Sequence, residues 1–102
     1  RKDNTHEGRC RVNRYQCSVT SDGQMKRFAV GDGGATIATP GLGNMSLLRS
    51  WWPDAGGGLE QRLALRLVAA DGAILAEQLA PASDGRIALQ VPNGHIECAG
   101  AK

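Results

Sequence analysis

The chain has 102 residues, enough for one domain with a single hydrophobic core and too few for two. Only 4% of its residues are aromatic, so aliphatic side chains must form most of that core. A formal net charge of +2 is too small to predict nucleic-acid binding, and no apolar run approaches the ~20 residues of a membrane-spanning helix.

The positive charge is concentrated in the N-terminal part. Residues 1–27 contain seven basic and three acidic side chains, whereas the remainder contains five basic and seven acidic ones. Arg1, Lys2 and Arg9 could bring the chain close to a membrane surface or an acidic partner, although a solvated tail has the same composition. The first residue is Arg rather than Met, so we expect a signal peptide or anchor to have been removed, or the chain to have been trimmed. We predict a flexible basic segment over 1–8, one β domain over 9–99 and a tail over 100–102.

Five tight-turn signals divide the chain, at Asp22-Gly23, Asp32-Gly33-Gly34, Asp71-Gly72, Asp84-Gly85 and Asn93-Gly94. Asp or Asn followed by Gly tolerates the positive φ angles of hairpin turns. Alternating apolar and polar residues predict strands within 8–20, 25–30, 35–39 and 45–52, and a phase slip in the first of these is typical of a β-bulge or a break. Glycine-rich loops over 40–44 and 53–58 follow the third and fourth of these strands.

The segment 59–80 is rich in strong helix formers, so a helix and a hairpin must be compared. On a helix its apolar residues would project from opposite sides, whereas on a strand Leu63, Leu65 and Leu67 share one face. A turn at Asp71-Gly72 pairs like with like: Ala70 with Ala73, Ala69 with Ile74, Val68 with Leu75, Leu67 with Ala76 and Arg66 with Glu77. Such pairs stabilise an antiparallel ladder, so the hairpin is the better interpretation.

A second hairpin is predicted around Asn93-Gly94. A turn there places Val91 opposite Ile96, Leu89 opposite Cys98 and Gln90 opposite Glu97, which predicts that Cys98 is buried in a sheet. Eight short strands favour an all-β fold, a small antiparallel β-sandwich of immunoglobulin-like or related topology, with a small barrel as the alternative. Nothing in the sequence marks a particular family.

The three cysteines, Cys10, Cys17 and Cys98, allow at most one internal disulfide. In a straight strand Cys10 and Cys17 would lie roughly 23 Å apart, so their pairing requires a turn near Asn13 and Arg14. Otherwise Cys98 pairs with one of them. We favour a disulfide over three buried thiols, because an extracytoplasmic setting would permit it.

Catalysis has little support, because neither His6 nor His95 accompanies a recognisable nucleophile and no phosphate-binding motif is present. We therefore predict that the chain is not an enzyme and carries no cofactor; a small hydrolase whose site forms only in three dimensions is the third hypothesis. The runner-up is a periplasmic protein that handles copper or zinc through its cysteines and a His or Met. The spacing of these residues does not favour it, so no metal site is assigned.

The strongest candidate for a recognition surface is Ser50-Trp51-Trp52-Pro53-Asp54. Adjacent strand residues point to opposite faces, so at most one Trp can enter the core, and Trp is frequent in binding hot spots. Arg49 and Arg62 are expected to flank this site. The short strand 35–39 could also accept a partner strand at its edge, although Pro40 would limit the pairing.

These observations predict a non-catalytic protein-binding or assembly module of a bacterial envelope or secreted protein, whose partner is another protein. The sequence does not predict the oligomeric state.

Overall fold

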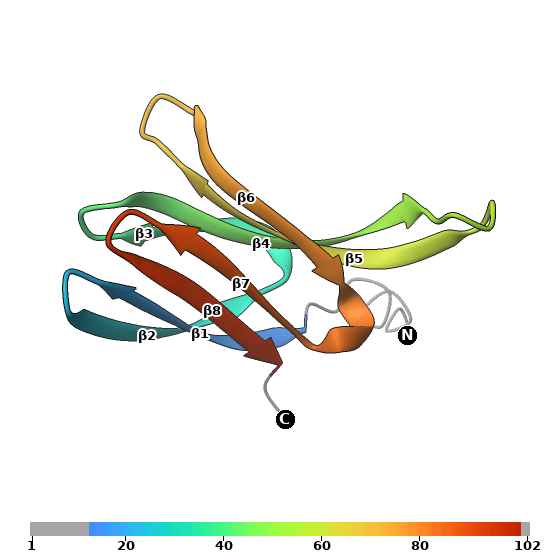
Figure 1. The fold of residues 1–102 in the computed structure, drawn as a ribbon, viewed down its shortest axis with the longest axis horizontal. Helices are drawn as coiled ribbons and strands as arrows, with labels where there is room; N and C mark the ends of the chain where they lie inside the picture. The colour runs from blue at the N-terminus through green and yellow to red at the C-terminus, as the bar shows by residue number, and fades with distance from the viewer. Residues whose placement is uncertain (1–12, 101–102) are drawn as a thin grey trace, which may run out of the picture.

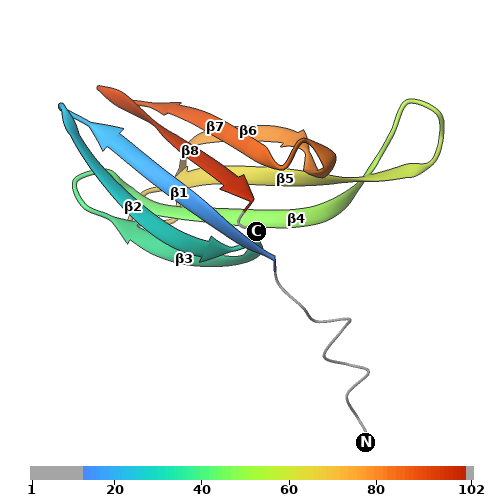
Figure 2. The same ribbon diagram turned by 90° about the horizontal axis from the view of Figure 1, so that it is seen from below.

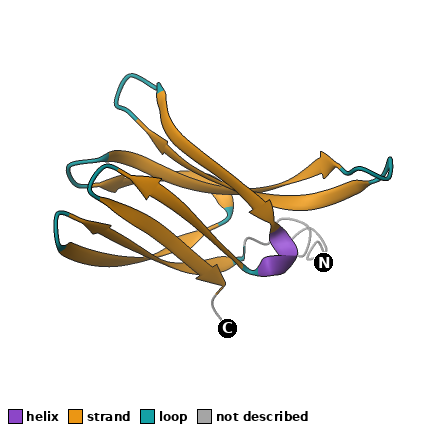
Figure 3. Cartoon of the chain, viewed as in Figure 1, coloured by secondary structure: helices purple, strands orange, loops and turns teal. Residues whose placement is uncertain are grey.

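The computed structural model describes residues 13–100, which form eight antiparallel strands in two sheets (Figure 1). The strands are β1 (Arg14–Ser21), β2 (Gln24–Gly31), β3 (Gly33–Thr39), β4 (Gly43–Pro53), β5 (Leu59–Val68), β6 (Ile74–Pro81), β7 (Arg86–Val91) and β8 (Gly94–Gly100). A short 3-10 turn, η1 (Ala82–Asp84), separates β6 from β7 (Figure 3). The predicted all-β sandwich is confirmed, and the strands do not close into the alternative barrel.

The two sheets have the orders β2-β1-β8-β7 and β3-β4-β5-β6. Figure 2 shows the first sheet lying across the second. The chain changes sheet twice, at Asp32 and at η1. The second sheet is a simple meander, whereas immunoglobulin domains have Greek-key connections. Of the two predicted topologies, immunoglobulin-like or related, the structure therefore has a β-sandwich whose strand order differs from the immunoglobulin one.

The core lies between the inward faces of the two sheets. Alternate residues of β1, β4, β5, β7 and β8 are buried, so the period-2 patterns found in the sequence become buried rows in these strands, whereas the edge strands β2 and β3 bury one residue each and β6 none. The buried apolar side chains are Tyr15, Cys17, Val19, Val30, Met45, Leu47, Leu63, Leu65, Leu67, Ile87, Leu89, Val91, Ile96 and Cys98. The leucines that argued for a strand in 59–68 therefore form the centre of the core.

A disulfide joins Cys17 of β1 to Cys98 of β8, which face each other in the ladder. It connects the first and last described strands, which are 81 residues apart in sequence. The prediction of an internal disulfide is thus confirmed, and Cys17–Cys98 is one of the three pairings that the sequence allows. Cys10 lies outside the described residues, as do His6, Arg1, Lys2, Arg9 and the predicted segment 1–8.

The hairpin at Asp71-Gly72 forms with the predicted pairs Leu67–Ala76 and Arg66–Glu77, but its tip is irregular. Val68 pairs with Ile74 rather than with Leu75, because the ladder shifts by one residue there. The loop closes through hydrogen bonds from Ala69 N to Ala73 O and from Gly72 N to Ala69 O. The predicted two-residue turn is therefore wrong at the tip and right along the strands.

The predicted register of the last hairpin is wrong by two residues. Leu89 pairs with Ile96 and Val91 with Gly94, so Pro92 and Asn93 form the turn. The physical reason lies in β1: a Cβ on Gly94 would come within 1.7 Å of the Thr20 carbonyl oxygen. Gly94 is thus needed for close approach to β1 rather than for the turn, and the shift keeps each side chain on its predicted face.

The turn predicted at Asp32-Gly33 is also wrong, because β2 and β3 lie in different sheets. Asp32 lies at this crossing and is 5% exposed; its carboxylate accepts hydrogen bonds from Asn13, next to β1, and from Arg49 of β4. At the C-terminus β8 ends at Gly100, one residue beyond the predicted domain limit. Within residues 13–100 the helical structure is limited to η1, so no helix there is long and apolar enough to cross a membrane.

Candidate binding site on the β4–β5 arm

The hairpin of β4 and β5 extends beyond its neighbours. The β3–β4 pairing reaches Leu48, and the β5–β6 pairing ends where Arg62 meets Pro81, whereas β4 and β5 continue to pair as far as Pro53 and Leu59. We call residues 50–61 the arm. Figure 1 shows it projecting past the rest of the sandwich, at the side opposite the β5–β6 tip.

The inward face of the arm continues the core-facing rows of the sheet. Trp51 and Pro53 are in phase with Leu47, and the paired Gln61 and Leu59 are in phase with Leu63. Leu47 and Leu63 are buried, whereas Trp51 and Leu59 are each 64% exposed. The apolar row therefore runs out from the core onto a face that no other part of residues 13–100 covers.

The outer face of the arm carries a set of polar contacts around Trp52. The indole Nε1 of Trp52 donates to Ser50 Oγ at 2.8 Å, and the Arg62 guanidinium lies 5.8 Å from the Trp52 ring centroid. Arg62 also pairs with Glu60 at 2.6 Å. A cation over an aromatic face stabilises the position of both groups. Trp52 is therefore half-buried, and its indole N–H already has a hydrogen-bond acceptor within the chain.

The tip of the arm is built around Asp54. Its Oδ1 accepts hydrogen bonds from the backbone N–H groups of Gly56 and Gly58, each at 2.9 Å. Asp54 N also donates to Gly58 O, and Gly57 adopts φ +90°, which favours glycine. Asp54 therefore shapes the loop through the hydrogen bonds that its Oδ1 accepts.

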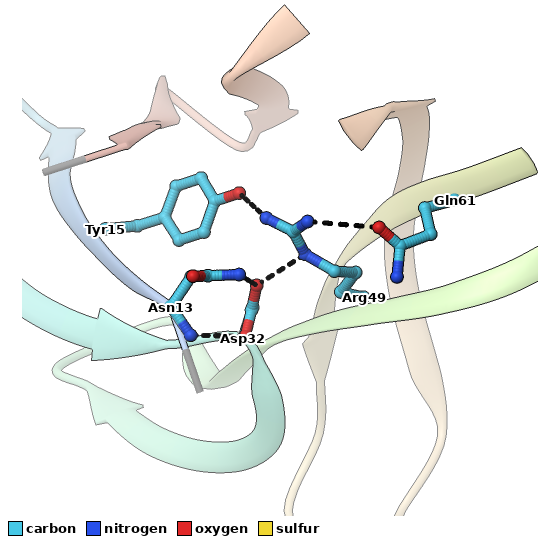
Figure 4. Close-up of polar contacts among 5 residues, drawn as sticks. All are labelled: Asn13, Tyr15, Asp32, Arg49 and Gln61. Carbon is cyan, nitrogen blue, oxygen red and sulfur yellow. Dashed lines mark hydrogen bonds and ion pairs between the residues drawn. The ribbon is translucent and has the colours of Figure 1, made fainter. Parts of the chain in front are cut away.

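The root of the arm is fixed by Arg49, which bonds to residues of both sheets (Figure 4). Arg49 Nε donates to Asp32 Oδ2 at 2.8 Å, Nη2 to the Tyr15 hydroxyl at 3.0 Å and Nη1 to Gln61 Oε1 at 3.2 Å. Asp32 accepts two further bonds, from the backbone and the side-chain amide of Asn13. This cluster ties β1, the β2–β3 crossing, β4 and β5 together where the arm begins.

The charge of Arg49 is stabilised at this position. Burial alone would lower its pKa, but the hydrogen bonds to Asp32 and Tyr15 outweigh that effect, and the pKa is raised. Arg49 therefore stays cationic and bonded, with a structural role at the root rather than a free contact on the surface.

The structure brings the five residues predicted for the site into one region but divides them by face. Trp51 is the exposed apolar residue, Trp52 and Arg62 stack on the other side, Asp54 forms the tip and Arg49 the root. The sequence analysis missed Leu59, which shares the exposed face with Trp51. The signal was available, because Leu59 is in phase with the core leucines of the same strand.

Regions away from the arm give weaker support for a functional site. Two hollows of about 810 Å³ and 630 Å³ lie away from the arm, the first beside β1, β7 and β8 and the second between turns at the opposite end of the sandwich. Within the described part of the chain, no group of three His, Cys, Asp or Glu side chains could hold a metal ion. Cys17 and Cys98 are bonded to each other, so neither presents a free thiolate to a metal in this state.

Comparisons with known proteins do not assign this site. No protein-family model matches the chain, and neither a curated protein nor a solved structure matches it. The functional argument therefore depends on the geometry of the arm.

Proposed function

We propose that this chain is a non-catalytic protein-binding module that engages another protein through the inward face of the arm. The observation that carries the proposal is the exposure of Trp51 and Leu59, each 64%, on a face that elsewhere forms the core. Large apolar groups gathered on one face mark interaction sites more often than isolated ones do. Trp is also the side chain most enriched among residues that dominate binding energy.

The mechanics of the arm support this function. A two-stranded ribbon by itself is marginally stable in water, because one of its faces has nothing to pack against. Here the root cluster around Arg49 and the Asp54 loop hold both ends in place. The ribbon is thus presented in a fixed shape, which lowers the entropy that a partner must remove on binding.

The cellular setting is proposed as extracytoplasmic, in a bacterial envelope or secreted protein. The Cys17–Cys98 disulfide supports this, since structural disulfides persist mainly in oxidising compartments. Secretion also suits a module that meets its partner outside the cytoplasm.

The test is affinity capture from an envelope extract of the producing organism. A Trp51→Ser/Leu59→Ser variant should lose a discrete partner that the parent chain retains. The matched control is Ile74→Ser/Leu75→Ser, which removes two apolar side chains, each 55% exposed, at the other end of the sandwich. Equal capture by both variants, or loss in both, would contradict a specific role for the arm.

A further inference from the structure

The strand β6 forms one edge of the second sheet, and no strand within residues 13–100 pairs with its outer side (Figure 1). The direction of its backbone groups follows from the ladder. Arg49 N donates to Asp32 O, away from β5, and alternate residues of a strand direct both backbone groups to the same side. The even-numbered residues of β5 therefore bond to β4, and the odd-numbered ones bond to even-numbered residues of β6. Glu77 and Leu79 then direct their backbone groups away from the sheet.

The free part of this edge is limited at both ends. At one end the ladder shifts register where Val68 pairs with Ile74, and at the other Pro81, which has no N–H, leads into η1. Between these limits Glu77 and Leu79 offer two N–H groups and two carbonyl groups. The Leu79 carbonyl accepts a hydrogen bond from the exposed side chain of the preceding residue, but its second lone pair can still accept from a neighbouring strand.

The edge of β6 also lacks unpaired charge. Edge strands commonly carry charged side chains that prevent pairing with another chain. In the first sheet, β2 has Lys26 and Arg27 in mid-strand and β7 begins with Arg86. The one charged side chain of β6, Glu77, is paired with Arg66 of β5. The edge is therefore electrically neutral and open to a strand of the same kind.

The inward face of β6 leaves room for such a strand. Gln78 lies opposite the buried Leu65, yet its own side chain is exposed. Together with Ala80 it lines the hollow of about 810 Å³, whose other side includes Arg86 and Ala88 of β7. The first sheet therefore does not cover β6 at Gln78, and a strand added beside β6 would extend the second sheet over this hollow.

The free groups of β6 match those of a second copy in one register. With the two Gln78 residues opposite each other, Glu77 of each copy lies opposite Leu79 of the other, and every free N–H meets a carbonyl. With Glu77 at the centre, two carboxylates would lie directly opposite, which is destabilising. With Leu79 at the centre, Glu77 would face Pro81, which has no N–H to donate. The favoured register therefore has a twofold axis at Gln78, the symmetry of most homodimers.

From these observations we propose that two copies of this chain pair edge to edge along β6, with the twofold axis at Gln78. The product is one continuous sheet, in which β3-β4-β5-β6 of one copy is followed by the same strands of the other in reverse order. An interface of one strand on each side belongs to the small, transient class, so the dimer is reversible. The surface is separate from the arm, and the proposal does not depend on the proposed function.

The experiment traps the pair through cysteines placed on β6, in a Cys10→Ser background. In this register the two Cα atoms of residue 78 lie about 4.5 Å apart, within the range of a disulfide. Gln78→Cys should therefore give a disulfide-linked dimer under mild oxidation. Ala76→Cys is the matched control on the same face, because its counterpart lies roughly 13 Å away along the strand. A mixture of Ala76→Cys and Ala80→Cys chains should crosslink, whereas each alone should not, since these residues lie opposite each other.

Charge placed at Leu79 gives a second readout that needs no added cysteine. Leu79→Glu puts a carboxylate opposite Glu77 of the second copy, and Leu79→Lys puts an ammonium there. Both variants lose the same leucine, so their comparison isolates the charge. The dissociation constant from sedimentation should be about 5- to 30-fold higher for Leu79→Glu than for Leu79→Lys, and the difference should shrink at high salt.

Circular dichroism melts establish that each variant is folded before these comparisons are made. Equal crosslinking of Gln78→Cys and Ala76→Cys would overturn the twofold pairing, as would equal dissociation constants for the two Leu79 variants. A chain that stays monomeric at every concentration and forms no crosslink would overturn it too. Crosslinking of Gln78→Cys to a different protein of an envelope extract, without self-crosslinking, would make that protein the occupant and overturn the inference.

Discussion

Replacing Arg49 by Met should destabilise the fold far more than a comparable change on the surface. The substitution removes three side-chain hydrogen bonds, and the carboxylate of Asp32, a residue that is 5% exposed, would keep only the bonds from Asn13. Breaking a fully buried ion pair costs about 3–5 kcal/mol. Because the Arg49 side chain is 25% exposed, we expect a smaller loss of about 2–3 kcal/mol in the free energy of unfolding.

The assay is guanidinium denaturation and calorimetry of the disulfide-intact chain. For a domain of this size, such a loss lowers Tm by roughly 10–20 °C. Arg62→Met is the matched control: its pair with Glu60 is 32% and 36% exposed and its guanidinium lies over Trp52, so we expect a loss of about 1 kcal/mol. The double variant Asp32→Asn/Arg49→Met should be less destabilised than the sum of the two single changes, because it removes the orphaned charge. Equal losses for Arg49→Met and Arg62→Met would refute the structural role assigned to the root.

Two further predictions concern the β1–β8 pair. Cys17→Ala/Cys98→Ala opens a loop closed over 81 residues, and the chain-entropy relation gives a loss of up to about 4.5 kcal/mol, measured by denaturation against the oxidised parent; a loss under about 1 kcal/mol would show that the bond is not a main source of stability. Gly94→Ala should prevent folding or separate the two strands, since its Cβ would lie 1.7 Å from a backbone oxygen. Gly23→Ala, where φ is +80° but the space is open, should cost only about 1 kcal/mol, so similar circular dichroism melts for the two variants would contradict the close approach.

Much of the fold follows from local patterns in the sequence. The in-phase leucines at 63, 65 and 67 and the pair Arg66–Glu77 identify a hairpin that helix propensity alone would have missed. The predicted register of the last hairpin was wrong because its constraint comes from a strand that is distant in sequence. Gly94 looks like a turn residue in sequence, and only its contact with Thr20 reveals why it lies in β8.

The candidate site was predicted in composition but not in arrangement. Alternation indicates that Trp51 and Trp52 point in opposite directions, but it cannot tell where the opposing sheet ends. The place where the opposing sheet ends depends on the crossing from β2 to β3 at Asp32, whose carboxylate accepts a hydrogen bond from Arg49 of β4. A contact between residues 17 positions apart leaves no periodic signal, so the uncovered state of Trp51 and Leu59 emerges only from the assembled sandwich.

The most direct test of the binding function is photo-crosslinking in the producing cell. A benzophenone amino acid is placed at Trp51, at Leu59 or, as the control, at Leu75, which is 55% exposed at the far end of the sandwich. We predict the same discrete protein adduct from Trp51 and Leu59 and no such adduct from Leu75. Absence of an adduct at both arm positions, or equal labelling at Leu75, would contradict the claim that the arm is a specific protein-binding site.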